Sequence, residues 1–137
     1  NQIYSKNYTP DTTGGAPATQ LFSRSDNGTS FQLTGINGST NGFAWAGGLL
    51  IQWGFVNQAL SEGTNSTVTF KERAVGSIRF PTTCLNVQTT AYRGAANPGG
   101  ACVIDINNIT LSATQFDWRA HTNASNYTGF YWIAVGY

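Results

Sequence analysis

Charged residues are few in this sequence, so several kinds of functional site are not expected. Charged side chains make up 9% of the 137 residues, whereas soluble domains usually carry about 25%. The seven basic residues are scattered and the net charge is +1, so the chain lacks the clustered positive charge by which nucleic-acid binding is recognised. No hydrophobic run approaches the ~18 residues of a membrane-spanning helix. We therefore expect neither nucleic-acid binding nor membrane insertion.

Methionine is absent, even at position 1, and only two cysteines occur, Cys84 and Cys102. No signal-peptide pattern opens the chain. These features predict a fragment or a processed product of a longer protein. The cysteines could form one disulfide across the 17 residues between them, or they could be two buried small apolar residues, which free cysteine most resembles. The spacing leaves both alternatives open.

Catalytic groups are also few. His121 is the only histidine, and one histidine with two distant cysteines cannot make a tetrahedral metal site. A glycosidase needs two carboxylates beside the scissile bond, and Asp105 and Asp117 are the pair to test because both fall in predicted strands. The favoured interpretation is that both are outward strand residues, with Asp117 paired to Arg119 on the same face. We therefore predict no enzyme activity, no cofactor and no metal site.

What the sequence has in abundance suits β structure. Aromatic residues reach 13%, and the polar content is mainly Asn, Thr, Ser and Gly, which favour turns and strands over helices. Short apolar segments separated by turn residues predict an all-β protein, an antiparallel sandwich. We expect an irregular, turn-rich lead-in over residues 1–42, with one or two short strands, and a sandwich over residues 43–137.

The last eight residues are apolar or aromatic at both even and odd positions. A half-exposed strand would alternate apolar with polar side chains. This strand therefore has to be covered on both faces, by its own sandwich, by a partner chain, or by both. The residues that we expect in the core or in such an interface are Trp45, Trp53, Trp132 and Tyr137.

Two polar loops, residues 91–100 and 121–129, are the candidate binding surface. Amide, hydroxyl and tyrosine side chains suit uncharged polar ligands such as sugars, and loops carried on a rigid sheet are where binding usually occurs. The candidate ligand-binding residues are Tyr92, Arg93, Asn97, His121, Asn123, Asn126 and Tyr127.

Three segments, residues 45–54, 80–88 and 130–137, carry a family resemblance. They read WAGGLLIQWG, FPTTCLNVQ and FYWIAVGY. Their order and spacing resemble the C-terminal receptor-binding domain of bacteriophage tail fibres, a family that ends in a W-x-A-x-G-Y strand and includes the fibre tips of phage-tail-like bacteriocins. The resemblance covers roughly residues 43–137.

The resemblance implies a homotrimeric β-sandwich tip at the distal end of a virion tail fibre. It implies host adhesion through a bacterial surface polysaccharide or lipopolysaccharide, assembly in the bacterial cytoplasm, and therefore reduced cysteines. Residues 1–42 would then be fibre shaft or neck. Residues 71–78 depart from the family pattern as an insertion. Some family tips hold an axial metal between paired histidines, but this chain has no His-x-His.

Three functions compete at this point. A non-enzymatic receptor-binding tip is favoured, because acids are few and there is one histidine. The alternatives are a glycan-degrading domain like a tailspike depolymerase and a purely structural trimerisation cap. Release of sugar from host polysaccharide would separate the first two, and binding to host cells would separate the first from the third.

Overall fold

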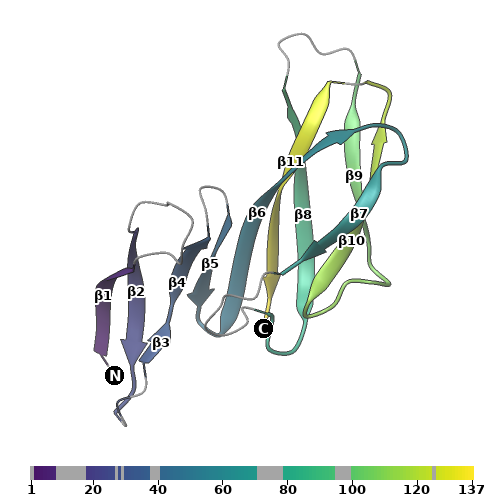
Figure 1. The fold of residues 1–137 in the computed structure, drawn as a ribbon. Helices are drawn as coiled ribbons and strands as arrows, with labels where there is room; N and C mark the ends of the chain where they lie inside the picture. Colours follow the sequence, from purple (N-terminus) through teal and green to yellow (C-terminus); the bar gives the residue numbers. More distant parts are fainter. Residues whose placement is uncertain are drawn as a thin grey trace.

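The fold is entirely β in the part of the chain that the structure describes. The computed structural model describes residues 2–8, 18–26, 28, 30–37, 41–70, 79–94, 100–124 and 126–137. Their strands form three sheets in which every neighbouring pair is antiparallel (Figure 1), which confirms the predicted all-β antiparallel class. The strands are β1 (Gln2–Tyr8), β2 (Ala18–Arg24), β3 (Ser30–Gln32), β4 (Thr34–Asn37), β5 (Asn41–Ala46), β6 (Leu49–Leu60), β7 (Asn65–Thr69), β8 (Cys84–Arg93), β9 (Cys102–Asn107), β10 (Gln115–Thr122) and β11 (Tyr127–Gly136).

The largest sheet has the order β4-β5-β6-β11-β8, with the C-terminal strand β11 between two long neighbours. A second sheet, β1-β2-β3, continues it toward the N-terminus, as Figure 1 shows. Leu33 joins the two sheets, because its N–H donates to Leu21 (2.7 Å) and its carbonyl accepts from Trp45 (2.8 Å). The third sheet, β7-β10-β9, forms the other layer of the sandwich.

The N-terminal region holds more strand than the sequence predicted. Its described residues form four strands, β1 to β4, where we expected one or two. These strands are short and mostly polar, and they form because β1 and β2 pair along seven residues while β4 pairs with β5. Pairing between strands therefore stabilises strands that the local hydrophobic pattern does not predict. The division at residue 42 stays a prediction.

The core lies between the sheets β7-β10-β9 and β6-β11-β8. Trp118 of β10 packs edge-to-face on Phe130 of β11, with ring centroids 4.8 Å apart, and Phe116 packs on Trp132 at 5.6 Å. Such aromatic contacts contribute beyond the area that they bury. The buried apolar residues are Phe43, Leu50, Leu60, Phe70, Phe80, Cys84, Val87, Ile104, Phe116, Trp118, Ala120, Tyr127, Phe130 and Ala134.

Two tryptophans lie across glycines of the neighbouring strand. Trp132 is the register partner of Gly54, and a Cβ placed on Gly54 would lie 2.5 Å from the Trp132 ring. Trp53 is the partner of Gly42 and covers it in the same way on the opposite face of the sheet. The glycines therefore make the space in which the indole rings lie flat against the backbone.

A Gly54→Ala variant tests this packing. We expect it to lower the free energy of unfolding by about 1–3 kcal/mol, because the new methyl forces the partly buried Trp132 ring to move. Urea unfolding at neutral pH measures the change. Gly47→Asn is the control, since Gly47 has open space and a φ of 57° that asparagine tolerates. Equal stability of Gly54→Ala and the wild type would contradict the prediction.

Both cysteines are free thiols, so the disulfide alternative is wrong in this structure. Cys84 begins β8 and Cys102 begins β9. Burial raises the pKa of the Cys84 thiol to about 11, and burial also raises that of Cys102. Both therefore stay protonated and weakly nucleophilic at neutral pH.

Two further points concern the described residues only. No helix among them is long and apolar enough to cross a membrane. The insertion predicted at residues 71–78 lies outside the described residues.

Candidate functional site

A hollow of about 590 Å³ lies on the outer face of the β7-β10-β9 sheet. Its lining side chains are mainly amides, hydroxyls and charged groups, which is the composition expected for binding a polar ligand. Each of the three strands contributes to it. The lining residues are Asn65, Ser66, Thr67, Asp105, Ile106, Asn107, Asp117, Trp118, Arg119 and His121.

The period-two alternation of β10 builds this face. Phe116, Trp118 and Ala120 are buried in the sandwich, so Asp117 and Arg119 between them point outward. The sequence predicted this alternation for residues 116–119, and the burial pattern of the strand confirms it.

Strand register arranges the outward side chains in two cross-strand rows. Asp117 lies opposite Thr67 of β7 and Asn107 of β9. Arg119 lies opposite Asn65 and Asp105 in the same two strands. Neighbouring strands are about 4.8 Å apart and alternate residues of one strand roughly 7 Å. The hollow therefore presents a flat array of hydrogen-bonding groups with one carboxylate and one guanidinium at the centre of its rows.

His121 lies at the end of this array between two carboxylates. Its Nδ1 is 3.0 Å from Glu62 Oε1 and its Nε2 is 3.2 Å from Asp105 Oδ2. These contacts join the turn after β6 to β9 across β10, so they hold the rim of the hollow together.

Glu62 is held mainly by the backbone. The N–H of Thr122 donates to Glu62 Oε2 at 2.8 Å. This hydrogen bond, followed by that of His121, holds the pKa of Glu62 below its ordinary 4.5. A carboxyl whose pKa is lower in the folded than in the unfolded chain adds stability above the unfolded value, and that stability is lost as the pH falls through the folded value.

A Glu62→Gln variant tests this. We expect the wild type to be more stable than the variant at pH 7, and the difference to shrink as the pH falls below about 4.5 because the carboxylate becomes protonated. Thermal unfolding at a series of pH values from 7 to 3 measures it. A difference that stays constant over this range would contradict the prediction.

Several polar groups of the array remain available. Asp117 Oδ1 accepts from Thr67 Oγ1 at 2.5 Å, which leaves Oδ2. Asn107 Oδ1 accepts from the N–H of Ile109, so its amide NH₂ is left. The expected Asp117–Arg119 ion pair is not among the salt bridges of the described residues. The Arg119 side chain makes no hydrogen bond or salt bridge with a described residue, although its charge acts on the Glu62 carboxylate. Its guanidinium is thus an unused donor beside the hollow.

Sequence reasoning placed the site in the loops and therefore missed Asn65, Thr67, Asn107 and Arg119. The available signal was the alternation of residues 116–119, from which Asp117 and Arg119 were placed on one face. The partners on β7 and β9 could not be found in the same way, because strand pairing between distant segments leaves no local pattern.

The predicted loop residues Arg93 and Tyr127 serve the fold. Arg93 Nη2 donates to the Gly100 carbonyl and lies 2.8 Å from the Tyr127 hydroxyl, and the guanidinium covers the Tyr127 ring at 5.0 Å. Tyr127 is only 6% exposed, and its hydroxyl donates to the same carbonyl. This geometry supports a packing role that closes the loop ends rather than contact with a ligand.

Two of the three predicted asparagines also make hydrogen bonds within the fold. Asn123 Oδ1 accepts from the N–H of Ala101 at 2.9 Å, and the Asn126 carbonyl accepts from Gly94. Asn97 lies outside the described residues. Of the six predicted ligand-binding residues that the structure describes, only His121 lines the hollow, and a ligand role for the others stays a prediction.

Tyr92 lies on a different surface, the outer face of the large sheet. Its ring packs edge-on to Phe55 and Tyr131, at 5.4 and 5.7 Å between centroids. Tyr131 and Phe55 are cross-strand partners, as are Ile133 and Trp53. We call this surface the apolar stripe; its members are Ile51, Trp53, Phe55, Tyr92, Tyr131, Ile133 and Val135.

The four residues predicted for core or interface fall in two groups. Trp45 and Trp132 pack against the buried core. Trp53 and Tyr137 are 36% and 47% exposed. An interface role for the second pair stays a prediction.

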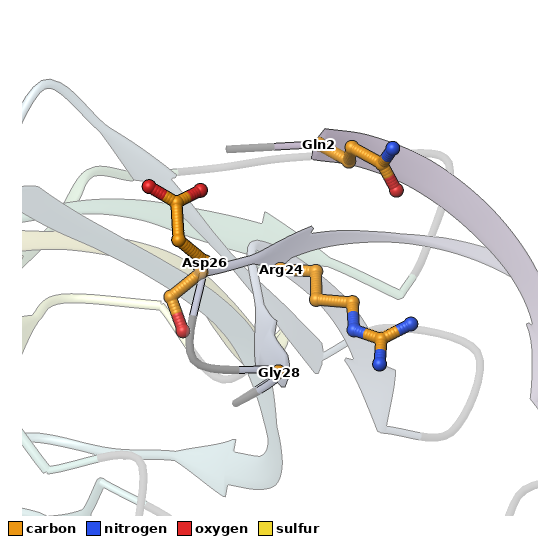
Figure 2. Close-up of a pocket in the computed structure, with 5 residues that line it drawn as sticks. Gln2, Arg24, Asp26 and Gly28 are labelled. Atoms are coloured by element: carbon orange, nitrogen blue, oxygen red, sulfur yellow. The ribbon is translucent and has the colours of Figure 1, made fainter.

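A second hollow, of about 340 Å³, lies in the N-terminal sheet. Figure 2 shows that the side chains of Arg24 and Asp26 extend in different directions there. This hollow is lined by Gln2, Arg24, Ser25, Asp26 and Gly28.

No metal centre is formed within the described ranges. No set of three or more His, Cys, Asp or Glu side chains there is arranged to hold a metal ion. The chemistry available in the larger hollow is therefore hydrogen bonding by neutral and charged side chains.

Comparison with known proteins gives one family. The family model described as "Putative tail fiber protein gp53-like, C-terminal" matches residues 43–137. A relative, the uncharacterized protein MJ0347 of Methanocaldococcus jannaschii, is 36% identical over 93 residues, which are 66% of this chain and 58% of the relative. The chain thus corresponds to little more than half of that relative's length.

Solved structures share the fold. An N-truncated R1-type pyocin tail fiber matches with a TM-score of 0.57 at 24% identity, over 76% of this chain and 85% of the other. The R1 pyocin fiber of P. aeruginosa matches with a TM-score of 0.56 at 23% identity, over 76% of this chain and 28% of the other. At these identities the likeness concerns the arrangement of the strands.

Proposed function

Because this chain belongs to the family of gp53-like tail fiber C-terminal domains, we propose that it is the receptor-binding tip of a tail fibre and that it binds a bacterial surface glycan. The proposal continues the resemblance that the three sequence segments predicted, which the family match confirms. The tip would be assembled with the fibre in the bacterial cytoplasm and would attach the particle to its host.

The single observation that supports glycan binding is the polar hollow on β7-β10-β9. A sugar offers hydroxyl groups that donate and accept, and the hollow offers amides, a carboxylate and an unused guanidinium on a rigid sheet. Side chains fixed on strands bind without first being ordered, which lowers the entropic cost of association.

The apolar stripe supports assembly into a homotrimer. Three successive cross-strand pairs, Phe55–Tyr131, Trp53–Ile133 and Ile51–Val135, put apolar side chains on the outer face of the sheet. Tyr131 and Ile133 are 48% and 43% exposed in the single chain. A contiguous apolar surface of this kind marks an interaction site, and packing around a threefold axis would cover it in every copy.

Adsorption of the assembled 137-residue chain to bacteria tests the binding proposal. We expect it to bind the surface of some strains in a host panel, and purified surface polysaccharide from those strains to compete. A trimer that binds no strain would favour the structural cap. Binding that survives removal of the polysaccharide would place the receptor among surface proteins.

Glycan hydrolysis is a second candidate, because Asp105 and Asp117 line one hollow, as a pair of catalytic carboxylates must. Both already have hydrogen-bond or ion-pair partners in Thr67 and His121, so binding is favoured. Incubation with polysaccharide from a bound strain decides the matter: sustained release of reducing ends, abolished in Asp105→Asn and Asp117→Asn, would establish hydrolysis.

A further inference from the structure

We propose that the hollow on β7-β10-β9 recognises a vicinal diol of an uncharged sugar, with Asp117 and Arg119 as the two specificity-determining residues, and that it discriminates against acidic sugars. This inference rests on the proposed function and adds to it the ligand class and the residues that select it.

The diol follows from the two groups at the centre of the rows. Asp117 has an oxygen that can accept a hydrogen bond, and Arg119 has unused N–H donors. The two residues are alternate members of one strand, so their Cα atoms are roughly 7 Å apart, a distance that one sugar ring can bridge. One hydroxyl donates to Asp117 while its neighbour accepts from Arg119, which satisfies both side chains.

The remaining amides extend the same pattern. Asn65 Nδ2 donates to the Gly63 carbonyl at 3.0 Å, so its oxygen is left for a ligand. Asn107 keeps its NH₂ group. Each row therefore offers both functions: Asn107 can donate in the row of Asp117, and Asn65 can accept in the row of Arg119, where Asp105 adds a carboxylate. Groups in this alternation suit hydroxyls, which carry both functions, better than they suit a carboxylate or a phosphate, which only accept.

Charge gives the discrimination against acidic sugars. The hollow and its rim carry three carboxylates, on Glu62, Asp105 and Asp117, against one guanidinium and one imidazole. Their sum is negative whether or not His121 is protonated. An anion bound at Arg119 would also be repelled by the carboxylates of Asp105 and Asp117, which line the same hollow, so the attraction to the guanidinium is offset.

The second hollow supplies a matched control. Arg24 and Asp26 are also an arginine and an aspartate at alternate positions of one segment, and both line a polar hollow (Figure 2). This hollow lies outside residues 43–137, the part that matches the family. Arg24→Gln and Asp26→Asn therefore change the same chemistry elsewhere on the molecule.

The test uses the assembled 137-residue chain and an array of oligosaccharide pairs that differ only in a hexose or the corresponding hexuronic acid. A third copy of each hexose member is oxidised with periodate, which cleaves vicinal diols, and then reduced with borohydride. Binding is measured for the wild type and for Asp117→Asn, Arg119→Gln, Arg24→Gln and Asp26→Asn. Thermal unfolding of each variant shows whether it folds as the wild type does.

We expect the wild type to bind a hexose member about tenfold more tightly than its acidic partner, and oxidation to remove the binding. Asp117→Asn and Arg119→Gln should each weaken binding about tenfold, since each loses a charge-assisted hydrogen bond. Asp117→Asn should also reduce the difference in affinity between the hexose member and its acidic partner. The two control variants should bind as the wild type does.

Other outcomes overturn the inference in separable ways. Loss of binding in Arg24→Gln or Asp26→Asn, with Asp117→Asn and Arg119→Gln unaffected, would move the site to the other hollow while glycan binding stands. Equal binding of acidic and neutral members, or binding that survives oxidation, would show that the ligand is not recognised through a vicinal diol of an uncharged sugar. A wild type that binds neither the array nor host cells would overturn the proposed function itself.

Discussion

Replacing Phe130 by alanine is expected to lower the free energy of unfolding by about 3–5 kcal/mol. Phe130 is fully buried at the centre of the sandwich, and its ring packs on Trp118 at 4.8 Å. Truncation would remove the buried ring and leave a cavity between the two sheets, because hydrogen-bonded neighbouring strands hold each strand in place and limit its movement into the space. Urea unfolding of the assembled chain measures the loss.

Ile109→Ala is the control for this variant. Ile109 is 94% exposed in the turn after β9, and such surface substitutions usually change stability by less than about 0.5 kcal/mol. Similar losses for the two variants, or a loss below about 1 kcal/mol for Phe130→Ala, would mean that β11 does not lie at the centre of the core.

Replacing Ile133 by lysine is expected to separate the proposed homotrimer into single subunits that stay folded. Ile133 lies in the middle of the apolar stripe, beside its cross-strand partner Trp53, and is 43% exposed in the single chain. In the isolated subunit a lysine at position 133 can reach solvent. In an interface its ammonium group would be buried without a partner, which is strongly unfavourable. Sedimentation velocity at micromolar concentration measures the change.

Val103→Lys is the control, because Val103 is an exposed apolar residue on the outer face of the other sheet. It should sediment with the wild type. A wild type that sediments as a monomer would contradict the trimer directly. A trimer that tolerates Ile133→Lys would show that the copies associate through another surface, and a wild-type dimer would replace threefold by twofold packing of the stripe.

These two variants concern residues three apart on one strand, for which the sequence predicted cover on both faces. Residues 130–137 are apolar at even and odd positions alike, which indicated that both faces of the strand need cover. The structure assigns the faces: Phe130 and Ala134 are buried in the sandwich, while Tyr131 and Ile133 remain exposed. In the proposed trimer, neighbouring copies would cover the exposed face.

The candidate site was predicted less completely than the fold. The sequence named His121, Asp105 and Asp117 for separate reasons, and the structure brings all three to one hollow. It also directed attention to Arg93 and Tyr127, whose side chains donate to the Gly100 carbonyl, and a ligand role for them stays a prediction. A polar residue in a loop is equally suited to hold that loop in shape and to bind a ligand, so residue type alone does not separate the two roles.

The sequence by itself determined the all-β class and the strands with strong alternation, because side-chain period and turn chemistry are local properties of the chain. The family followed from the resemblance of three segments to known tail fibre tips. Only the tertiary structure decided which strands are neighbours. The opposition of Asp117 to Thr67 and Asn107, and of Trp132 to Gly54, depends on register between segments far apart in sequence. Register is fixed by packing of the whole sandwich, and the array of the candidate site exists only once that packing is complete.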